Sequence, residues 1–420
     1  MTARAWYVGL DLGPRTFTAA AAVRGAGGDV AALGSESVTG AGIDRGRIVD
    51  AAALRRSVEA LLTRVTDRLD AEIASVALTI PGSPCRRVAA SAERRFGTPN
   101  WIDSVTVQEL RLQTLRVPAA AGTVLASRSW ARVDGRRWPD SEPVGWGQRL
   151  RVDTEAWVVT PDYIAGYARM LAQLGFELDL LMPRVAAAAA VALHRTEMER
   201  GALAIDVGET ETDVAAYAGG VLRALFNVPH GFATRPELST ERSLNPSRST
   251  VPGRGRATPR GLAYGRPYST MAALNGAVRG AENATVTDAG PLTSTPANLF
   301  RQIRRRLEEL ELQRFVRGGL VLIGDGARRP DTLAAAVDVL GLPARVGRPL
   351  GWEGGRGCAD PALTAAIGLV LTQAQMHPDD EPPRTAPRAQ PVPVPARASH
   401  ERVGGLGRWL REFVPAGEGT

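Results

Sequence analysis

The chain has 420 residues, of which 44% are hydrophobic, and a formal net charge of +7. This length and apolar content suit a folded protein of two or three compact units. No run of about 18 or more apolar residues occurs, and residues 1–6 lack the charged-then-apolar pattern of a signal peptide, so we expect a cytoplasmic protein without a spanning helix. Cys85 and Cys358 have no His or Cys neighbours at metal-ligand spacing, which argues against a disulfide framework and a zinc site.

The basic residues other than histidine are all arginine, and they are spread along the chain. Nucleic-acid binding elements usually interleave basic and aromatic residues on one surface, and no single segment shows that pattern. We therefore expect no nucleic-acid partner.

The first segment predicts a hairpin that is followed by a helix and a strand. Residues 6–12 and 17–23 are apolar and β-prone, and Gly13-Pro14 separates them. Apolar residues at spacings of three and four predict a helix over 51–69, and they are Leu54, Val58, Leu61, Leu62, Val65 and Leu69. Residues 75–80 then predict a strand that ends at Pro81-Gly82.

Residues 83–161 differ in texture, with short strand-like runs, clustered arginines and turn signals such as Asp134-Gly135. We interpret them as an inserted subdomain. Helices are predicted over 162–174 and over the alanine-rich residues 185–194, which could pack closely against neighbours. Strands are predicted at 202–207 and 214–217.

The pattern of the opening hairpin recurs in this second half. Leu10-Asp11-Leu12-Gly13 and Ile205-Asp206-Val207-Gly208 each place an Asp at the end of an apolar strand, followed by Gly. Two related halves are therefore predicted. Downstream, a charged helix is expected over 296–314, a strand over 320–324 and another helix over 332–340.

Two segments have the composition of loosely ordered chain. Residues 239–297 are rich in Pro, Ser, Gly, Arg and Asn without a sustained period, and residues 377–401 form a proline-rich linker. The last segment, 402–415, predicts an amphipathic helix that binds a membrane surface. The residues expected to make that contact are Leu406, Arg408, Trp409, Leu410, Arg411, Phe413 and Val414. Docking of this stripe on the protein's own core or on a partner is the alternative.

Three turns could together hold a nucleotide. Turn amides of the two Asp-Gly hairpins can donate to phosphate oxygens while their carboxylates orient a hydrated Mg²⁺, and the Gly-rich turn 323–327 suits close approach by the adenine. Each turn alone is commonly structural. The candidate nucleotide-binding residues, for ATP with Mg²⁺, are Asp11, Gly13, Arg15, Thr16, Asp206, Gly208, Thr210, Gly324, Gly326 and Ala327.

With these turns in their order, the chain resembles the actin, hexokinase and heat-shock chaperone superfamily, and within it the FtsA family most closely. The resemblance covers nearly the whole chain. It is carried by residues 9–13, 206–213 and 322–327 as nucleotide loops, by Gly42-Ile43 through Asp50, by 133–135 with 143–150, by Val228-Pro229-His230-Gly231, and by 360–371 as the closing helix.

The resemblance implies an α/β, actin-like (ribonuclease H-like) two-lobed fold with an FtsA-type inserted subdomain, a C-terminal linker and an amphipathic helix. The implied division is 1–82 with 162–195 as lobe 1, 83–161 as the inserted subdomain, 196–238 with 298–376 as lobe 2, 239–297 as a degenerate region, 377–401 as linker and 402–415 as the membrane helix.

The resemblance also implies a function in cell division. Proteins of this family tether filaments of the tubulin-like FtsZ to the inner face of the cytoplasmic membrane, self-associate, and recruit other division proteins. The implied partners are FtsZ, further copies of the chain, inner-membrane lipids and other division proteins, and the implied location is the division septum.

The nucleotide loops depart from the family pattern. The second loop of the family reads Asp-x-Gly-Gly-Gly-Thr, whereas this chain has Glu209, Thr210 and Glu211 at the last three positions. A side chain where φ is positive costs about 1 kcal/mol, and a carboxylate near phosphate is repelled. Pro14 removes an amide donor from the first loop, although Arg15 could meet a phosphate directly. We therefore expect weak or lost ATPase activity, with no catalytic residue assigned.

Two alternatives remain open. One is an ATP-dependent kinase of the same superfamily, which would need intact phosphate loops and a catalytic base. The other is an actin-fold assembly component of type IV pili, similar to PilM, which shares the core and the insertion but does not typically end in a long linker and an amphipathic helix.

Overall fold

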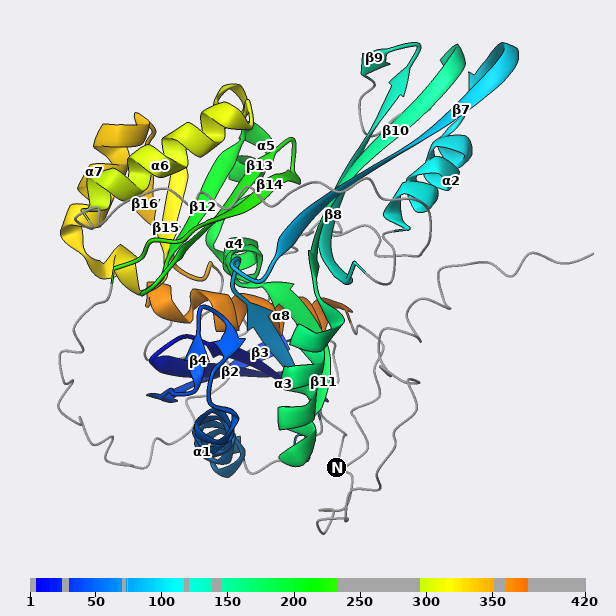
Figure 1. Ribbon diagram of the computed structural model, residues 1–420. Helices are drawn as coiled ribbons and strands as arrows, with labels where there is room; N and C mark the ends of the chain where they lie inside the picture. Colours follow the sequence, from blue (N-terminus) through cyan, green and yellow to red (C-terminus); the bar gives the residue numbers. More distant parts are fainter. Residues whose placement is uncertain are drawn as a thin grey trace, which may run out of the picture.

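The computed structural model describes residues 5–24, 30–69, 73, 75–116, 121–137, 145–232, 295–350 and 360–376. They form two sheets of five strands with helices on both faces, and a separate four-stranded sheet with its own helix (Figure 1). Most of the segment 239–297, the linker 377–401 and the amphipathic segment 402–415 lie outside the described residues. In the described part of the chain, no helix is both long and apolar enough to cross a membrane.

The first sheet has the strand order β11-β6-β1-β2-β3. Its strands are β1 (Ala5–Leu12), β2 (Thr16–Arg24), β3 (Val30–Thr39), β6 (Ser75–Ile80) and β11 (Glu177–Pro183). Helices α1 (Ala51–Leu69) and α3 (Pro161–Gln173) pack on one face, and the small hairpin β4 (Ile43–Asp44) and β5 (Arg47–Ile48) precedes α1. The predicted helix 51–69 and strand 75–80 are confirmed, and α3 begins one residue early because Pro161 suits the first helical position.

The second sheet repeats this arrangement with the order β14-β13-β12-β15-β16. Its strands are β12 (Ala202–Val207), β13 (Thr212–Ala218), β14 (Val221–Val228), β15 (Leu320–Ile323) and β16 (Ala344–Val346). In both sheets an antiparallel hairpin is extended by a third antiparallel strand on one side and by parallel strands on the other. The two halves predicted from the repeated Asp-Gly hairpin therefore share one topology.

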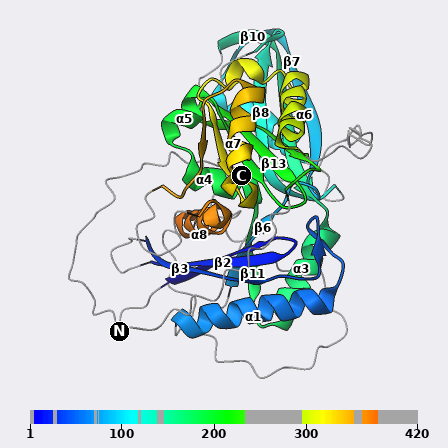
Figure 2. The same ribbon diagram turned by 90° about the vertical axis from the view of Figure 1, so that its left-hand side faces the viewer.

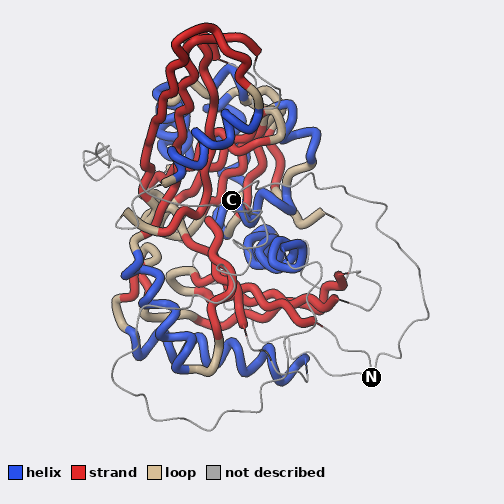
Figure 3. Tube along the Cα trace, turned by 90° about the vertical axis from the view of Figure 1, so that its right-hand side faces the viewer, coloured by secondary structure: helices blue, strands red, loops and turns tan. Residues whose placement is uncertain are grey.

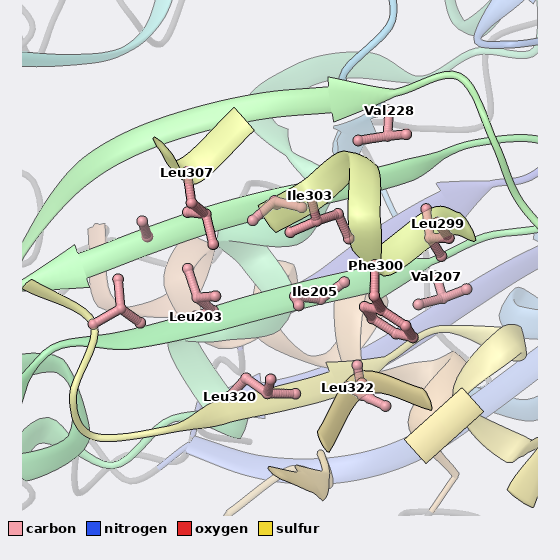
Figure 4. Packing of buried hydrophobic residues seen from close by; sticks show 14 of the residues in the cluster. Leu203, Ile205, Val207, Val228, Leu299, Phe300, Ile303, Leu307, Leu320 and Leu322 are labelled. Atoms are coloured by element: carbon pink, nitrogen blue, oxygen red, sulfur yellow. The ribbon is translucent and has the colours of Figure 1, made fainter. Parts of the chain in front are cut away.

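Helices α6 (Pro296–Glu309) and α7 (Pro330–Leu340) cover the outer face of the second sheet. Figure 4 shows Phe300, Ile303 and Leu307 of α6 lying against the leucine and isoleucine side chains of β12 and β15. Helix α6 ends at Glu309, five residues before the end predicted from the sequence. It stops there because Glu311 has a positive φ of 52° and the side chain of Leu312 packs into the core. The short helix η1 (Gln313–Phe315) follows.

Two further helices, α4 (Arg184–Ala192) and α8 (Thr364–Met376), lie between the two large sheets, and Figure 2 shows α8 end-on in this position. Small residues let them meet closely, since a Cβ at Gly368 would be 1.8 Å from the carbonyl oxygen of Ala187. The close packing expected of the alanine-rich helix is thus present. It ends at Ala192 and is followed by the short α5 (Arg195–Arg200).

The separate sheet has the order β7-β10-β8-β9. It consists of β7 (Arg86–Ile102), β8 (Thr123–Val133), β9 (Arg136–Arg137) and β10 (Gly145–Val159), with α2 (Ser104–Leu115) on one face. The predicted short strand-like runs are wrong here, because β7 and β10 are 17 and 15 residues long. Charged residues interrupt the apolar residues along these strands, so the sequence did not indicate two long strands. Figure 3 shows them rising as a narrow stack of strands.

Candidate functional site

The three predicted turns converge between the two large sheets. Arg15 of the β1–β2 turn pairs with Glu209 of the β12–β13 turn, with 2.9 Å between Nε and Oε1. The third turn adjoins the second, because a Cβ at Gly324 would lie 2.2 Å from Oδ1 of Asp206. The arrangement of the turns is therefore the one that the sequence predicts, whereas the partners of their side chains differ from those of a phosphate site.

The carboxylate of Asp11 is held by side chains of the same chain. It lies at the end of β1 and accepts hydrogen bonds from Thr79 Oγ1 at 2.5 Å and from Arg184 Nε at 2.7 Å. Arg184 Nη2 also donates to the carbonyl oxygen of Leu12 at 3.1 Å. The backbone N–H of Gly13 is bonded to the carbonyl oxygen of Thr16, which closes the first turn. Asp11 is thus already paired with a cation.

Arg184 is the first residue of α4 and is buried between the sheets. Burial acts to lower the pKa of its guanidinium, but the nearby carboxylates outweigh that effect and raise the pKa above its usual value. Those carboxylates belong to Asp11, Asp206, Asp213 and Glu211. Arg184 therefore remains charged and serves as the common counter-ion of the buried carboxylates.

The second turn is covered by the chain that follows β14. Gly208 donates its N–H to the carbonyl oxygen of Glu211, and its own carbonyl accepts from the N–H of Phe232. A Cβ at Gly231 would lie 2.5 Å from the carbonyl oxygen of Gly208, so the two segments are in direct contact. The strain predicted at Glu209 and Thr210 is absent: among the described residues other than glycine, only Arg45, Asp134 and Glu311 have a positive φ.

Two further carboxylates, Glu211 and Asp213, join the second hairpin to the first lobe. Asn227 Nδ2 donates to both, at 2.6 Å to Glu211 Oε2 and 2.7 Å to Asp213 Oδ1. From the turn after β6, the N–H of Gly82 donates to Asp213 Oδ2 at 2.9 Å, and Ser83 Oγ donates to Glu211 Oε1 at 3.2 Å. The turn that ends β6 is therefore docked on carboxylates of β13 and the residue before it.

The buried carboxylates hold protons more tightly than usual. Burial raises the pKa of Asp206 to about 7, against the opposing effect of Arg184, and the charges of Asp11, Asp325 and Glu211 add to the rise. Burial, followed by the charge of Glu211, raises the pKa of Asp213 to about 8. Burial also raises the pKa of the partly exposed Glu209, against the effect of Arg15. At neutral pH the cluster therefore keeps protons that free carboxyl groups would release.

The third turn packs on the end of β12. It comprises Gly324 and the short helix η2 (Asp325–Arg328), and a Cβ at Gly326 would lie 2.3 Å from Val207 Cγ1. Arg328 pairs with Asp325 at 3.2 Å and donates through Nε to Asp360 at 3.0 Å, just before the short helix η3 (Pro361–Leu363). Ala327 is buried and donates its N–H to the carbonyl oxygen of Gly324.

These residues do not fit the phosphates of a nucleotide. Phosphate oxygens require free N–H groups and cations, but Arg15 and Arg184 are both paired with carboxylates of the chain. A carboxylate about 4 Å from a phosphate oxygen is repelled by about 4 kcal/mol at an intermediate dielectric. Among the described residues, no group of three or more His, Cys, Asp or Glu side chains has the arrangement of a metal site.

Sequence reasoning missed several residues of this cluster. Arg184, Thr79 and Asn227 were not expected there, and Asp213 was seen only as the end of the second loop. The one signal for Arg184 is its position: it is the only charged residue of the alanine-rich segment 184–192. The predicted membrane-binding residues, from Leu406 to Val414, lie outside the described residues.

The comparisons with known proteins agree with this fold. No family model matches the chain. The cell division protein FtsA of Escherichia coli is 22% identical over 392 residues, which cover 90% of this chain and 92% of the relative. FtsA of Pseudomonas aeruginosa is also 22% identical, over 393 residues that cover 89% of this chain and 90% of the relative.

Among solved structures, the PilM–PilN type IV pilus biogenesis complex matches with a TM-score of 0.52 and 16% identity, covering 88% of this chain and 98% of that chain. The predicted α/β actin-like fold is confirmed. In sequence, the chain is similar to FtsA at low identity over most of its length.

Proposed function

We propose that this chain is a cell-division scaffold of the FtsA type in which ion pairs and hydrogen bonds of the chain itself occupy the cleft between the lobes, in place of ATP. The observation that carries the proposal is the Arg184 cluster: a buried guanidinium of the chain pairs with Asp11, the residue expected to orient Mg²⁺. Similarity to FtsA along 90% of the chain supports the cell-division part.

Internal contacts can replace a ligand as the link between lobes. The Arg15–Glu209 pair, the Gly82–Asp213 hydrogen bond and the Ser83–Glu211 hydrogen bond all cross from the first half to the second. The charges of Asp206, Asp213 and Glu211 in the second half also attract the buried guanidinium of Arg184 in the first half, and separating the halves would remove that attraction. The scaffold would then have one fixed lobe arrangement and little or no ATPase activity.

The proposed partners are FtsZ filaments, further copies of the chain, other division proteins and the lipids of the inner membrane. The amphipathic segment 402–415 would hold the protein on the cytoplasmic face of the membrane at the septum. Its five apolar residues contribute about 1 kcal/mol each when partly buried, so one copy binds weakly and several copies on a filament bind stably.

Co-sedimentation with anionic liposomes tests the membrane part of the proposal. The full chain is compared with a chain ending at His400 and with Trp409→Glu, which keeps the length but opposes burial of the stripe. We expect the full chain to pellet with the vesicles and both variants to stay in solution. Equal behaviour of all three proteins would contradict the membrane assignment.

Calorimetric titration with ATP and Mg²⁺ tests the proposed loss of the nucleotide site. We expect no tight binding by the full chain, and an Arg184→Ala variant that remains folded should not gain it, because Glu209 and Glu211 persist. Tight, Mg²⁺-dependent binding of ATP would overturn the proposal. The FtsZ contact is then tested separately, by co-sedimentation of the chain with FtsZ polymers.

A second candidate is an assembly component of type IV pili, favoured by the match to the PilM–PilN complex over 88% of this chain. In that case, the tail would be expected to dock on protein rather than lipid. Full-length protein that binds neither liposomes nor FtsZ polymers, but binds a PilN-like protein, would favour this alternative.

A further inference from the structure

The separate four-stranded sheet, β7-β10-β8-β9, has one face that α2 does not cover. Leu150 and Val152 of β10 point toward α2 and belong to the apolar cluster beneath it. Because side chains alternate along a strand, Arg151, Asp153 and Glu155 point to the opposite face. Three of their six partners in register are also charged, namely Glu93 on β7 and Arg128 and Arg132 on β8.

Three carboxylates on this face each form ion pairs with two arginines. Glu93 accepts from Arg95 at 2.7 Å and Arg149 at 2.6 Å, Asp153 pairs with Arg151 at 2.8 Å and Arg132 at 3.4 Å, and Glu155 accepts from Arg87 and the Nε of Arg128, both at 2.7 Å. We call these six arginines the arginine face. The two hydrogen bonds from Arg149 and Arg95 lower the pKa of Glu93 to about 2, so its charge persists at any physiological pH.

The arginines cover the carboxylates from solvent. The Asp153 and Glu155 side chains are 13% exposed, whereas Arg132, Arg151 and Arg87 are 44% to 49% exposed and Arg95 is 76% exposed. Six positive charges over three negative ones leave a surplus of three. Trp130 lies on the same face, with Arg128 and Arg137 over its ring at 5.2 and 5.5 Å. The surface offered to a partner is therefore guanidinium and aromatic.

The adjoining edge of the sheet is open. Strand β7 is 17 residues long, and among the described strands it pairs only with β10, which leaves the backbone groups of its outer edge without a strand partner. An exposed edge of this length is a template for an added strand. Nucleic acids and lipid headgroups can neutralise arginines, but only a polypeptide can also use the backbone of an edge strand.

We infer that the arginine face and the outer edge of β7 together bind an extended acidic segment of a partner protein. The segment adds as a strand beside β7, and its alternate side chains lie over the open face. There its carboxylates meet Arg87 and Arg95, whose planar guanidinium groups can bind carboxylate through two hydrogen bonds. This site is distinct from the cleft between the lobes and does not depend on the function proposed above.

Fluorescence anisotropy of a labelled peptide of alternating Glu and Val, titrated with the full chain, tests the inference. We expect binding that weakens as salt rises, and no binding of a matched peptide of alternating Lys and Val. The double variant Arg95→Gln/Arg132→Gln should weaken binding about tenfold or more. The control Arg305→Gln removes an equally exposed arginine from α6, where it pairs with Glu309, and should leave binding unchanged.

Hydrogen exchange of the full chain with the Glu-Val peptide tests the edge. The peptide should slow exchange of β7 amides, whereas exchange in α6 should not change. Binding without protection of β7 overturns strand addition. Absence of peptide binding, or a short DNA duplex or phosphatidylglycerol vesicles binding through the same arginines more tightly than the peptide, overturns the choice of an acidic segment.

Discussion

Arg184 donates its Nε to Asp11 Oδ1 across 2.7 Å, at the place where the two Asp-Gly hairpins of the fold meet. The chain thus supplies its own cation where the sequence pattern predicts a metal-bound nucleotide. A ligand can leave such a site, but a residue of α4 cannot. The buried pair makes the stability of the protein depend on groups that a nucleotide-binding relative would use for its ligand.

Replacing Arg184 with Ala should strongly destabilise the protein. Removal of one partner of a buried ion pair costs about 3–5 kcal/mol, because the remaining carboxylates are left without a counter-ion. The urea midpoint of Arg184→Ala should fall far below that of the parent, and Arg184→Lys should recover part of the loss. As a control, Arg195→Ala removes an exposed pair with Glu199, for which we expect less than about 1 kcal/mol. Equal losses in the two Ala variants would show that the cluster does not stabilise the fold.

The stability of the protein should fall as pH rises from about 5 to about 8. The pKa is raised to about 8 for Asp213 and about 7 for Asp206 in the folded state, whereas carboxyl groups of the unfolded chain titrate near about 4. The folded protein therefore binds protons that the unfolded chain releases, and the free energy of unfolding decreases with pH across that interval. Thermal unfolding between pH 5 and pH 8 should show a drop of several degrees in Tm.

An Asp213→Asn variant isolates the source of this pH dependence. Its side-chain oxygen can still accept from the N–H of Gly82, but the group no longer titrates. We expect a flatter dependence of Tm on pH than in the parent. The matched control is Asp162→Asn, an exposed position in the first turn of α3, which should keep the parent's slope. A slope unchanged by Asp213→Asn would assign the pH dependence to other groups.

The sequence predicted the elements whose signals are local. The Asp-Gly ends of β1 and β12 and the apolar period of α1 are visible within short windows, and the repeat of the first two implied the paired halves. Arg184 could not be predicted in the same way, because its partner Asp11 is 173 residues away and only the folded topology brings them together. The long strand β7 was missed because it contains charged residues such as Arg87, Glu93 and Arg95, together with glycine and proline, and therefore lacks the apolar content of a typical strand.

Gly324→Ala should be more harmful than the same change at another glycine with positive φ. Gly324 has φ of 80°, and a Cβ there would lie 2.2 Å from Asp206 Oδ1 and 2.8 Å from the carbonyl oxygen of Val207. Gly341, at the end of α7, has φ of 66° and open space around the same position. Gly341 has the left-handed helical conformation (ψ 24°), where alanine costs about 1–2 kcal/mol, whereas Gly324 (ψ 176°) has a conformation nearly restricted to glycine. The difference in urea midpoint therefore measures this backbone strain together with the close packing of the third turn on β12. Equal midpoints would mean that the turn can shift away from Asp206.

Trp157→Phe should loosen the attachment of the four-stranded sheet β7-β10-β8-β9. Trp157 is buried in β10, and its Nε1 donates to the carbonyl oxygen of Leu225 in β14 at 2.7 Å, which joins this sheet to the second large sheet. Phe keeps an aromatic ring but leaves that carbonyl without its donor, at a cost of about 1–2 kcal/mol. Limited proteolysis should then cut within residues 86–159 faster than in the parent. Trp146→Phe changes a ring that is 70% exposed at the far end of β10, so it should not alter the cleavage rate. If the two variants are cleaved alike, the attachment depends on packing around Trp157 and not on its hydrogen bond.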